Sequence, residues 1–181
     1  MNSLTFRGRK GPLLKTIARM LLLCMVWISF GCGVEAHAAG SELSESDVKA
    51  AFLAKFSQFV KWPSSRSPMT VGILGEDPFG GALEGMIKVK RSRRVEDLKS
   101  CQIIFISKSE RGNIGAILES LGSANILTVG ESDGFAKQGG AIGFVLVGDK
   151  VRFEINAGAA RRAGLNIDLQ LLKLAVRVFG Q

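Results

Sequence analysis

The stretch Cys101-Gln102-Ile103-Ile104-Phe105-Ile106 decides the fold class. It is a short, continuous apolar run, which is typical of a strand buried on both faces, and such strands belong to parallel sheets covered by helices. The next segment, Ser109 to Leu121, has the character of a helix. A buried strand followed by a helix is the repeating unit of an α/β sheet.

The same alternation continues toward the N-terminus. Apolar residues recur at helical spacing between Val48 and Val60, and Ser44 with Asp47 three residues later marks the start of that helix. Pro63 ends it. Two strands are predicted before Cys101, a buried one at Met69 to Leu74 and a basic edge strand at Ile87 to Val95. Between them, the turn from Gly75 to Gly80 leads into a short helix that ends at about Met86.

Toward the C-terminus the pattern ends in a hairpin. Further predicted elements are a strand at Ile126 to Val129, a short helix at Asp133 to Gln138, paired strands at Ala141 to Val147 and Val151 to Ile155, and helices at Ala157 to Ala163 and Asp168 to Val178. The sequence therefore predicts a three-layer α/β sandwich, whose mostly parallel sheet carries a C-terminal antiparallel hairpin at one edge.

Residues 1–38 read as a secretory signal peptide. Basic residues precede an apolar run from Met20 to Phe30, and Ala36-His37-Ala38 provides a cleavage site. A retained anchor is disfavoured because this run is about half of the roughly 20 residues that span a bilayer. A lipoprotein anchored at Cys32 is the other alternative. We expect an exported, periplasmic protein with one domain at residues 39–181.

Composition narrows the function classes. Removing residues 1–38 lowers the formal charge from 24 minus 16 (+8) to 19 minus 15 (+4), and no basic helix or aromatic platform indicates nucleic-acid binding. The only histidine, His37, and all cysteines except Cys101 belong to the predicted signal. We therefore expect no catalytic residues, no metal, no cofactor and no disulfide, with Cys101 unpaired.

Three local features admit a functional and a structural interpretation. The turn containing Gly75, Asp77 and Gly80 follows a strand and precedes a helix, where α/β sheets bind ligands, but a structural turn explains it as well. We interpret Ser107 or Ser109 as a helix cap rather than a nucleophile, because the sequence offers no general base to activate the hydroxyl. Cys101 is either an inert buried residue or a reactive thiol that forms an intermolecular disulfide.

Charged residues gather in the last hairpin and the following helix, at Arg152, Glu154, Arg161 and Arg162. A solvated face with weak ion pairs is one interpretation, and a recognition surface is the other. Strand alternation places Phe153 and Ile155 in the core and Arg152 and Glu154 on the opposite face.

The order of these segments resembles the YfiR family of periplasmic regulators. The resemblance covers essentially the whole mature chain and is carried by Ala50-Ala51-Phe52-Leu53, Phe59-Val60-Lys61-Trp62-Pro63, Ile73-Leu74-Gly75-Glu76-Asp77-Pro78-Phe79-Gly80, Cys101-Gln102-Ile103-Ile104-Phe105-Ile106-Ser107, Leu127-Thr128-Val129, Gly134-Phe135-Ala136, Gly139-Gly140, Arg152-Phe153-Glu154-Ile155-Asn156 and Ala159-Ala160-Arg161-Arg162-Ala163-Gly164-Leu165.

The resemblance implies a repressor of an inner-membrane diguanylate cyclase, acting on cyclic-di-GMP and biofilm, which an outer-membrane lipoprotein sequesters. It implies partner contacts at Glu154 and Ile142. A homodimer is left open. The chain departs from the two disulfides known in the family, since only Cys101 remains, with Gly72 at its partner's position and Ala136 and Gly143 at the second pair.

Two function hypotheses follow, and an enzyme is a distant third. The first is a regulator that binds the periplasmic part of a membrane cyclase through the last hairpin and the helix of Arg161 and Arg162. The second is a sensor of a small ligand at the turn of Gly75, Asp77 and Gly80, acting with a histidine kinase or another membrane receptor.

Overall fold

The elements follow the predicted alternation of strands and helices. The computed structural model describes residues 43–63 and 68–180, so the predicted signal peptide lies outside the described residues. The first part comprises α2 (Glu45–Phe59), β1 (Val60–Lys61), β2 (Thr70–Leu74), β3 (Lys88–Ser92), α3 (Val95–Leu98), β4 (Ile103–Ile106), the 3-10 turn η1 (Lys108–Glu110) and α4 (Ile114–Leu121). It continues with β5 (Leu127–Gly130), β6 (Ile142–Val147), β7 (Lys150–Asn156), α5 (Ala157–Arg162), β8 (Asn166–Ile167), α6 (Leu169–Leu174) and β9 (Arg177–Phe179).

Seven strands form the main sheet, in the order β3-β2-β4-β5-β6-β7-β9. All neighbours are parallel except β6 and β7, which form the predicted antiparallel hairpin, with Gly143 opposite Glu154. The very short strands β1 and β8 pair separately. The fold class predicted from the sequence is confirmed: a mostly parallel α/β sheet with helices on both faces.

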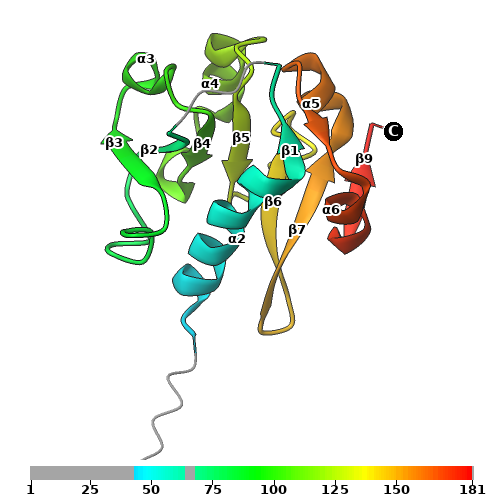
Figure 1. Cartoon of the computed structure of the whole chain (residues 1–181), viewed down its shortest axis with the longest axis horizontal. Coiled ribbons are helices and arrows are strands. Elements are labelled where there is room, and N and C mark those ends of the chain that lie inside the picture. The colour runs from blue at the N-terminus through cyan, green and yellow to red at the C-terminus, as the bar shows by residue number, and fades with distance from the viewer. Residues whose placement is uncertain (1–42, 64–67, 181) are drawn as a thin grey trace, which may run out of the picture. The chain divides into compact units, whose positions relative to one another are not determined.

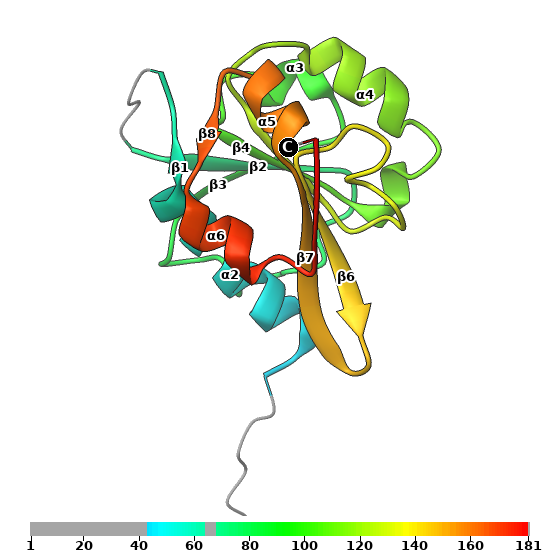
Figure 2. The ribbon, with the colours of Figure 1, turned by 90° about the vertical axis from the view of Figure 1, so that its right-hand side faces the viewer.

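Helices cover both faces of the sheet (Figures 1 and 2): α2 and α6 lie on one face, and α3, α4 and α5 on the other. Phenylalanines dominate the core under α2, where the ring of Phe56 meets those of Phe144 and Phe153 at 5.9 and 5.4 Å between centroids. The core under α3 and α4 is aliphatic, with Ile104 and Ile117 among its members. The near-continuous burial of β4 and β5 follows from this double cover.

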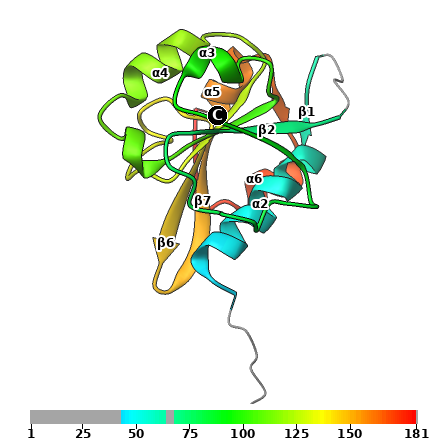
Figure 3. The same ribbon diagram turned by 90° about the vertical axis from the view of Figure 1, so that its left-hand side faces the viewer.

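The start of α2 is fixed as the sequence predicts. The Ser44 hydroxyl accepts a hydrogen bond from the Asp47 N–H at 3.2 Å, and the Asp47 carboxylate accepts one from the Ser44 N–H at 3.1 Å. This reciprocal pair satisfies two backbone donors that the helix itself cannot bond. The capping pair therefore fixes where α2 begins, and this first turn lies at the end of the molecule where the hairpin projects (Figure 3).

Three predicted helices before the hairpin differ from the structure. The segment between Gly80 and Met86 and the segment from Asp133 to Gln138 form turns rather than helices, because Gly80, Gly85 and Gly134 adopt positive φ angles of 54°, 79° and 69°. The predicted helix from Ser109 begins as the 3-10 turn η1, and α4 starts only at Ile114. Ser107 does cap η1, since its hydroxyl accepts from the Ser109 N–H at 3.4 Å.

The C-terminal end of the chain is the largest departure. The helix predicted from Asp168 to Val178 ends at Leu174, and Arg177–Phe179 form β9, which pairs in parallel with β7. The predicted hairpin is therefore next to the edge of the sheet rather than at it. The free edge of β7 explains the difference, because hydrogen bonding to it competes with continuing the helix.

The positions that the family resemblance paired do lie together. Cys101 is buried, and a Cβ built on Gly72 would be 3.2 Å from its Sγ. A Cβ on Gly143 would be 3.6 Å from that of Ala136, close to the separation found in disulfides. Burial raises the pKa of the Cys101 thiol, so the reactive thiolate is disfavoured. Within residues 43–63 and 68–180, no helix is long and apolar enough to cross a membrane.

Candidate functional site

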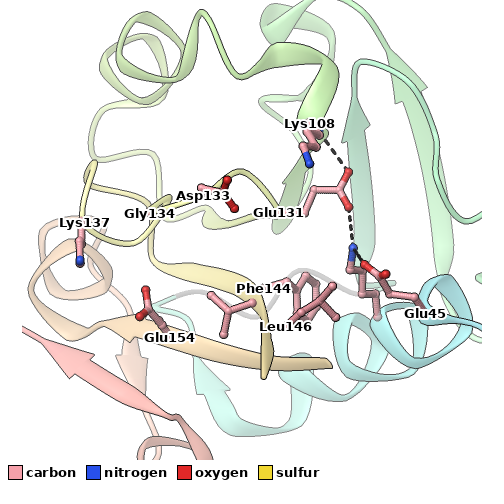
Figure 4. Close-up of a pocket in the computed structure, with 11 residues that line it drawn as sticks. Glu45, Lys108, Glu131, Asp133, Gly134, Lys137, Phe144, Leu146 and Glu154 are labelled. Carbon is pink, nitrogen blue, oxygen red and sulfur yellow. Dashed lines mark hydrogen bonds and ion pairs between the residues drawn. The ribbon is translucent and has the colours of Figure 1, made fainter. Parts of the chain in front are cut away.

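The main charged site lies beyond the carboxyl ends of β4 and β5, next to the hairpin and the start of α2 (Figure 4). We call this cavity of about 450 Å³ the Lys49 pocket. Its lining combines seven charged residues with one apolar wall: Glu45, Lys49, Lys108, Glu131, Asp133, Lys137 and Glu154, then Phe144, Val145 and Leu146, with Gly134 between. In Figure 4, Glu154 and Lys137 lie at one end and the Glu45–Glu131 cluster at the other.

Lys49 is the central charge of this cluster. Its side chain is 11% exposed, and its Nζ lies 2.8 Å from Glu131 Oε2 and 2.5 Å from Glu45 Oε1. Burial by itself lowers the pKa of Lys49, but hydrogen bonds to Glu131 and Glu45 outweigh it, and the pKa is raised. The ammonium is therefore held charged by its two carboxylate partners.

Glu131 connects three parts of the fold. It follows β5 directly, its Oε2 pairs with Lys49 of α2, and its Oε1 accepts a hydrogen bond from the Lys108 N–H of η1 at 3.1 Å. A carboxylate at this position ties a helix of one layer to the carboxyl ends of two central strands. This arrangement stabilises the fold. It also uses most of the hydrogen-bonding positions of the Lys49 ammonium and the Glu131 carboxylate.

The sequence prediction missed Lys49 and Glu131. Only the spacing of Glu45 and Lys49, four residues apart on a helix, was available as a signal, because such pairs share one helix face. Glu131 lies 82 residues from Lys49 in sequence, so nothing local indicates that the two side chains meet.

Glu154 was predicted as an exposed recognition residue, and the structure places it differently. Phe153 and Ile155 are core residues as predicted, and Glu154 does lie on the opposite face, but it is only 8% exposed. Its Oε1 pairs with Arg177 Nη1 of β9 at 3.2 Å. Because β9 was predicted as helix, this ion pair could not be foreseen.

Ile142 requires a correction. Its side chain is completely buried, on the face of β6 that packs under α2. A fully buried side chain cannot contact a partner directly, so the expected contact at Ile142 is wrong for this conformation. A substitution at Ile142 changes the packing of the core. It affects partner binding only by changing the shape of the hairpin.

The three predicted arginines lie at different places. Arg152 is exposed on the hairpin, Arg161 donates a hydrogen bond to the Gly180 carbonyl, and Arg162 lines a separate groove between α4 and α5. The structure therefore brings Arg152 close to the start of α2, and Arg161 to the C-terminal end, instead of forming one arginine patch.

The predicted ligand turn is occupied by contacts of its own. The Glu76 N–H donates to Ser109 Oγ at 3.0 Å, and a Cβ on Gly75, whose φ is +91°, would lie 2.4 Å from that oxygen. Asp77 pairs with Arg91 at 2.6 Å, and Arg91 also donates to the Gly80 carbonyl at 2.9 Å. Ser109 thus fills the crevice between β2 and β4 where a ligand was expected.

A second, more apolar cavity flanks the projecting hairpin, and we call it the hairpin-tip groove. It measures about 560 Å³ and is lined by Leu43, Glu45, Val48, Phe52, Leu146, Gly148, Asp149, Lys150, Val151 and Arg152. Leu43 and Leu146 are 71% and 57% exposed, and Val147 at the same tip is 54% exposed. Glu45 and Leu146 also line the Lys49 pocket, so the two cavities adjoin.

The structure is an α/β domain with two adjoining cavities beside the projecting hairpin. In the part of the chain that the structure describes, no group of three or more His, Cys, Asp or Glu side chains is placed to hold a metal ion. A family model for YfiR/HmsC-like proteins matches residues 46–176, which is well over half of the chain. This protein belongs to the YfiR/HmsC-like family, whose members are periplasmic regulators of diguanylate cyclases rather than enzymes.

Two solved structures have a similar fold. One is a conserved domain protein from Vibrio cholerae O1 biovar El Tor, with a TM-score of 0.52 and 14% identity over 75% of this chain. The other is the ABC domain from Streptococcus pneumoniae in complex with L-Trp, with a TM-score of 0.55 and 13% identity over 72%. The present chain spans 60% of each of them. Identities this low establish a common architecture and nothing about ligands.

Proposed function

We propose that this protein is a periplasmic regulator that binds and represses the periplasmic part of an inner-membrane diguanylate cyclase through the hairpin-tip groove. Family membership supports the class of partner. A second partner, an outer-membrane lipoprotein that competes for the same surface, is part of the proposal. Cyclase activity is then low while this protein is bound to the cyclase. It rises when the lipoprotein takes this protein away from the cyclase.

The observation that carries the proposal is the exposed apolar surface at the hairpin tip. Leu43 and Leu146 are each more than half exposed, and together with Phe52 they line one groove on the projecting end of the molecule. Val147, the next residue of the hairpin, is also more than half exposed. Burying such a cluster against a partner is favourable, by roughly 25 cal/mol for each Å² of apolar surface removed from water. The rim carries two charges of each sign, Glu45 and Asp149 beside Lys150 and Arg152, and therefore fits a partner with charged residues of both signs around an apolar centre.

The groove also fits the geometry of regulation. The β6–β7 hairpin extends past the other strands beside the first turn of α2 (Figures 2 and 3), so it reaches a partner before the rest of the sheet does. Its base is anchored in the phenylalanine core through Phe144 and Phe153. A hairpin whose base is packed in the core loses less conformational entropy on binding than a free loop does.

A deletion strain tests the proposal in the cell. Loss of the gene raises cyclic-di-GMP and biofilm, and a plasmid copy of the wild-type gene restores the low level. A copy with Leu146→Asp fails to restore it, because a charge in the groove prevents docking. Leu174→Asp, which changes an equally exposed leucine on α6, restores it fully. Unchanged cyclic-di-GMP in the deletion strain would remove the cyclase from the proposal.

A further inference from the structure

The projecting part of the hairpin has a free strand edge on the β6 side. β5 pairs with β6 only at Ile142 and Gly143, yet β6 continues to Val147. Beyond Gly143, the pairing with β7 is the one strand contact of β6 among the described residues. Figures 2 and 3 show the hairpin extending past β5, with β6 as its outer strand. The backbone from Phe144 to Val147 is therefore accessible to another strand on its outer side.

This outer edge carries peptide groups without a partner among the described residues. In an antiparallel pair, successive residues direct their N–H and C=O groups alternately toward the paired strand and away from it. The Asn156 N–H donates to the Ala141 carbonyl at 2.8 Å, so Ala141 faces β7, whereas Phe144 and Leu146 face outward. The pairing with β5 reaches no further than the Phe144 N–H, because Gly130 is its last member. The Phe144 carbonyl and both backbone groups of Leu146 are left unpaired.

β6 also lacks the protection that two other free edges have. Natural edge strands discourage unwanted pairing with charged side chains, with proline or with bulges. β3, at one end of the sheet, carries Lys88, Lys90 and Arg91. The projecting part of β7 carries Lys150 and Arg152. β6 has the sequence Ile-Gly-Phe-Val-Leu-Val, without a charge or a proline, and its register with β7 is regular. An apolar edge of this kind favours the addition of a strand.

There is space beside this edge for an added strand. Phe144, Val145 and Leu146 line the Lys49 pocket, whose volume is about 450 Å³. In Figure 4, Asp133 lies across the pocket from Phe144 and Leu146. A segment placed there continues the line of β5, because β5 is the neighbour of β6 in the sheet and ends at Gly130.

The charges beside the edge favour a different protein over a second copy of this chain. The pocket lining has four carboxylates against three ammonium groups: Glu45, Glu131, Asp133 and Glu154 against Lys49, Lys108 and Lys137. Two copies paired through β6 would bring two linings of net negative charge together, which is unfavourable. A complementary segment has a lysine or arginine at this end and apolar residues beside Leu146 and Val147.

From these observations we infer that β6 pairs, through the backbone of Phe144 to Val147, with an extended segment of the cyclase's periplasmic part. The inference rests on the proposed function and adds the mode of binding: a strand joins the sheet next to the apolar contacts of the hairpin-tip groove. Main-chain hydrogen bonds contribute affinity. Alternate side chains of the segment meet Leu146 on one face of β6 and Val147 on the other.

Amide hydrogen exchange, read residue by residue by NMR, tests the inference on the purified protein with and without the cyclase's periplasmic part. The Leu146 N–H has no partner in the free protein, so we expect binding to slow its exchange by about tenfold or more. The Val151 N–H, on the free edge of β7, is the control and changes by less than about twofold. Binding that leaves the exchange of the Leu146 amide unchanged would overturn strand addition and leave the proposed function standing.

A proline variant tests the same point through affinity. Leu146→Pro removes the outward N–H but keeps an apolar side chain, and proline is tolerated on edge strands where the N–H faces solvent. We expect its Kd for the cyclase's periplasmic part to rise about tenfold. Leu146→Met keeps the N–H and binds like the wild type. Equal affinities of the two variants would argue against main-chain pairing.

Two further outcomes locate a failure. If the wild-type protein does not bind the cyclase's periplasmic part, the proposed function is wrong and this inference is wrong with it. If the Leu146 amide becomes protected in the free protein as its concentration is raised, a second copy covers the edge, and the assignment of the edge to the cyclase is wrong. Analytical ultracentrifugation over the same concentrations detects that dimer.

Discussion

The Lys49 pocket and the hairpin-tip groove adjoin, yet they use their side chains in opposite ways. In the pocket, the Lys49 ammonium is bonded to Glu45 and Glu131, and Glu131 also holds the Lys108 backbone. In the groove, Leu43 and Leu146 stand in water with no apolar side chain covering them. The pocket has more charges, but its central ones, Lys49, Glu45 and Glu131, are bonded to one another.

This difference separates the residues that stabilise the fold from those that are suited to binding a partner. A charged cluster whose members bond one another gains little from a partner, because binding must first break those bonds. An exposed apolar cluster gains from any partner that covers it. We therefore assign the charged residues to the stability of the fold and propose the apolar tip as the docking surface. The predictions below test this division.

The largest expected effect is the loss of stability on removing Lys49. Lys49→Met leaves the partly buried carboxylates of Glu131 and Glu45 without their cation, and we expect the free energy of unfolding to fall by about 3 kcal/mol. Urea denaturation measures this. Lys55→Met, on an exposed position of the same helix, is the control and changes stability by less than about 0.5 kcal/mol. Equal effects for both variants would contradict a structural role of the cluster.

Leu146→Asp tests the other side of the comparison. We expect the Kd for the periplasmic part of the cyclase to rise about thirtyfold, because a carboxylate replaces an apolar contact in the centre of the interface. Unfolding free energy stays within about 0.5 kcal/mol of the wild type, since the side chain is 57% exposed. Calorimetric titration and urea denaturation give the two numbers. Tight binding by this variant would place the interface elsewhere.

The pH dependence of stability follows from the raised pKa of Lys49. The unfolded pKa is near 10.5 and the folded pKa is higher, so the folded state holds the proton more tightly. The stabilisation is fully present below pH 10.5 and is lost as the pH rises through the folded pKa. The stability difference between wild type and Lys49→Met is therefore constant from pH 7 to 10 and shrinks above pH 10.5. A difference that grows in that range would contradict the sign.

The smallest expected effect concerns Glu154. Arg177→Gln removes its cation, but the Arg177 side chain is 56% exposed, and water screens the pair. We expect a loss of about 0.5–1 kcal/mol in urea denaturation and no change in cyclase binding. Arg93→Gln, on the opposite edge of the sheet, is the control for the charge. A loss of affinity with unchanged stability would show that Glu154 and Arg177 contact the partner.

Much of the fold could be predicted from local sequence patterns. The apolar run at Ile103–Ile106, the capping pair of Ser44 and Asp47, and the hairpin turn at Gly148-Asp149 each specify their own geometry through neighbouring residues. The largest error arose where a distant strand decides the conformation. Leu174 to Val178 has helical spacing, but the open edge of β7 draws residues 177–179 into β9.

The predictions about the candidate sites divide in the same way, into those that depend on local sequence and those that depend on distant contacts. The sequence determined that this chain has an α/β fold, that Phe153 and Ile155 are core, and that Arg152 faces outward, because strand alternation is a local property. Only the tertiary structure decided that Ile142 is inaccessible, that Glu154 meets Arg177, and that Lys49 meets Glu131. Each of these depends on side chains far apart in sequence, and their distance is set by packing of the whole sheet.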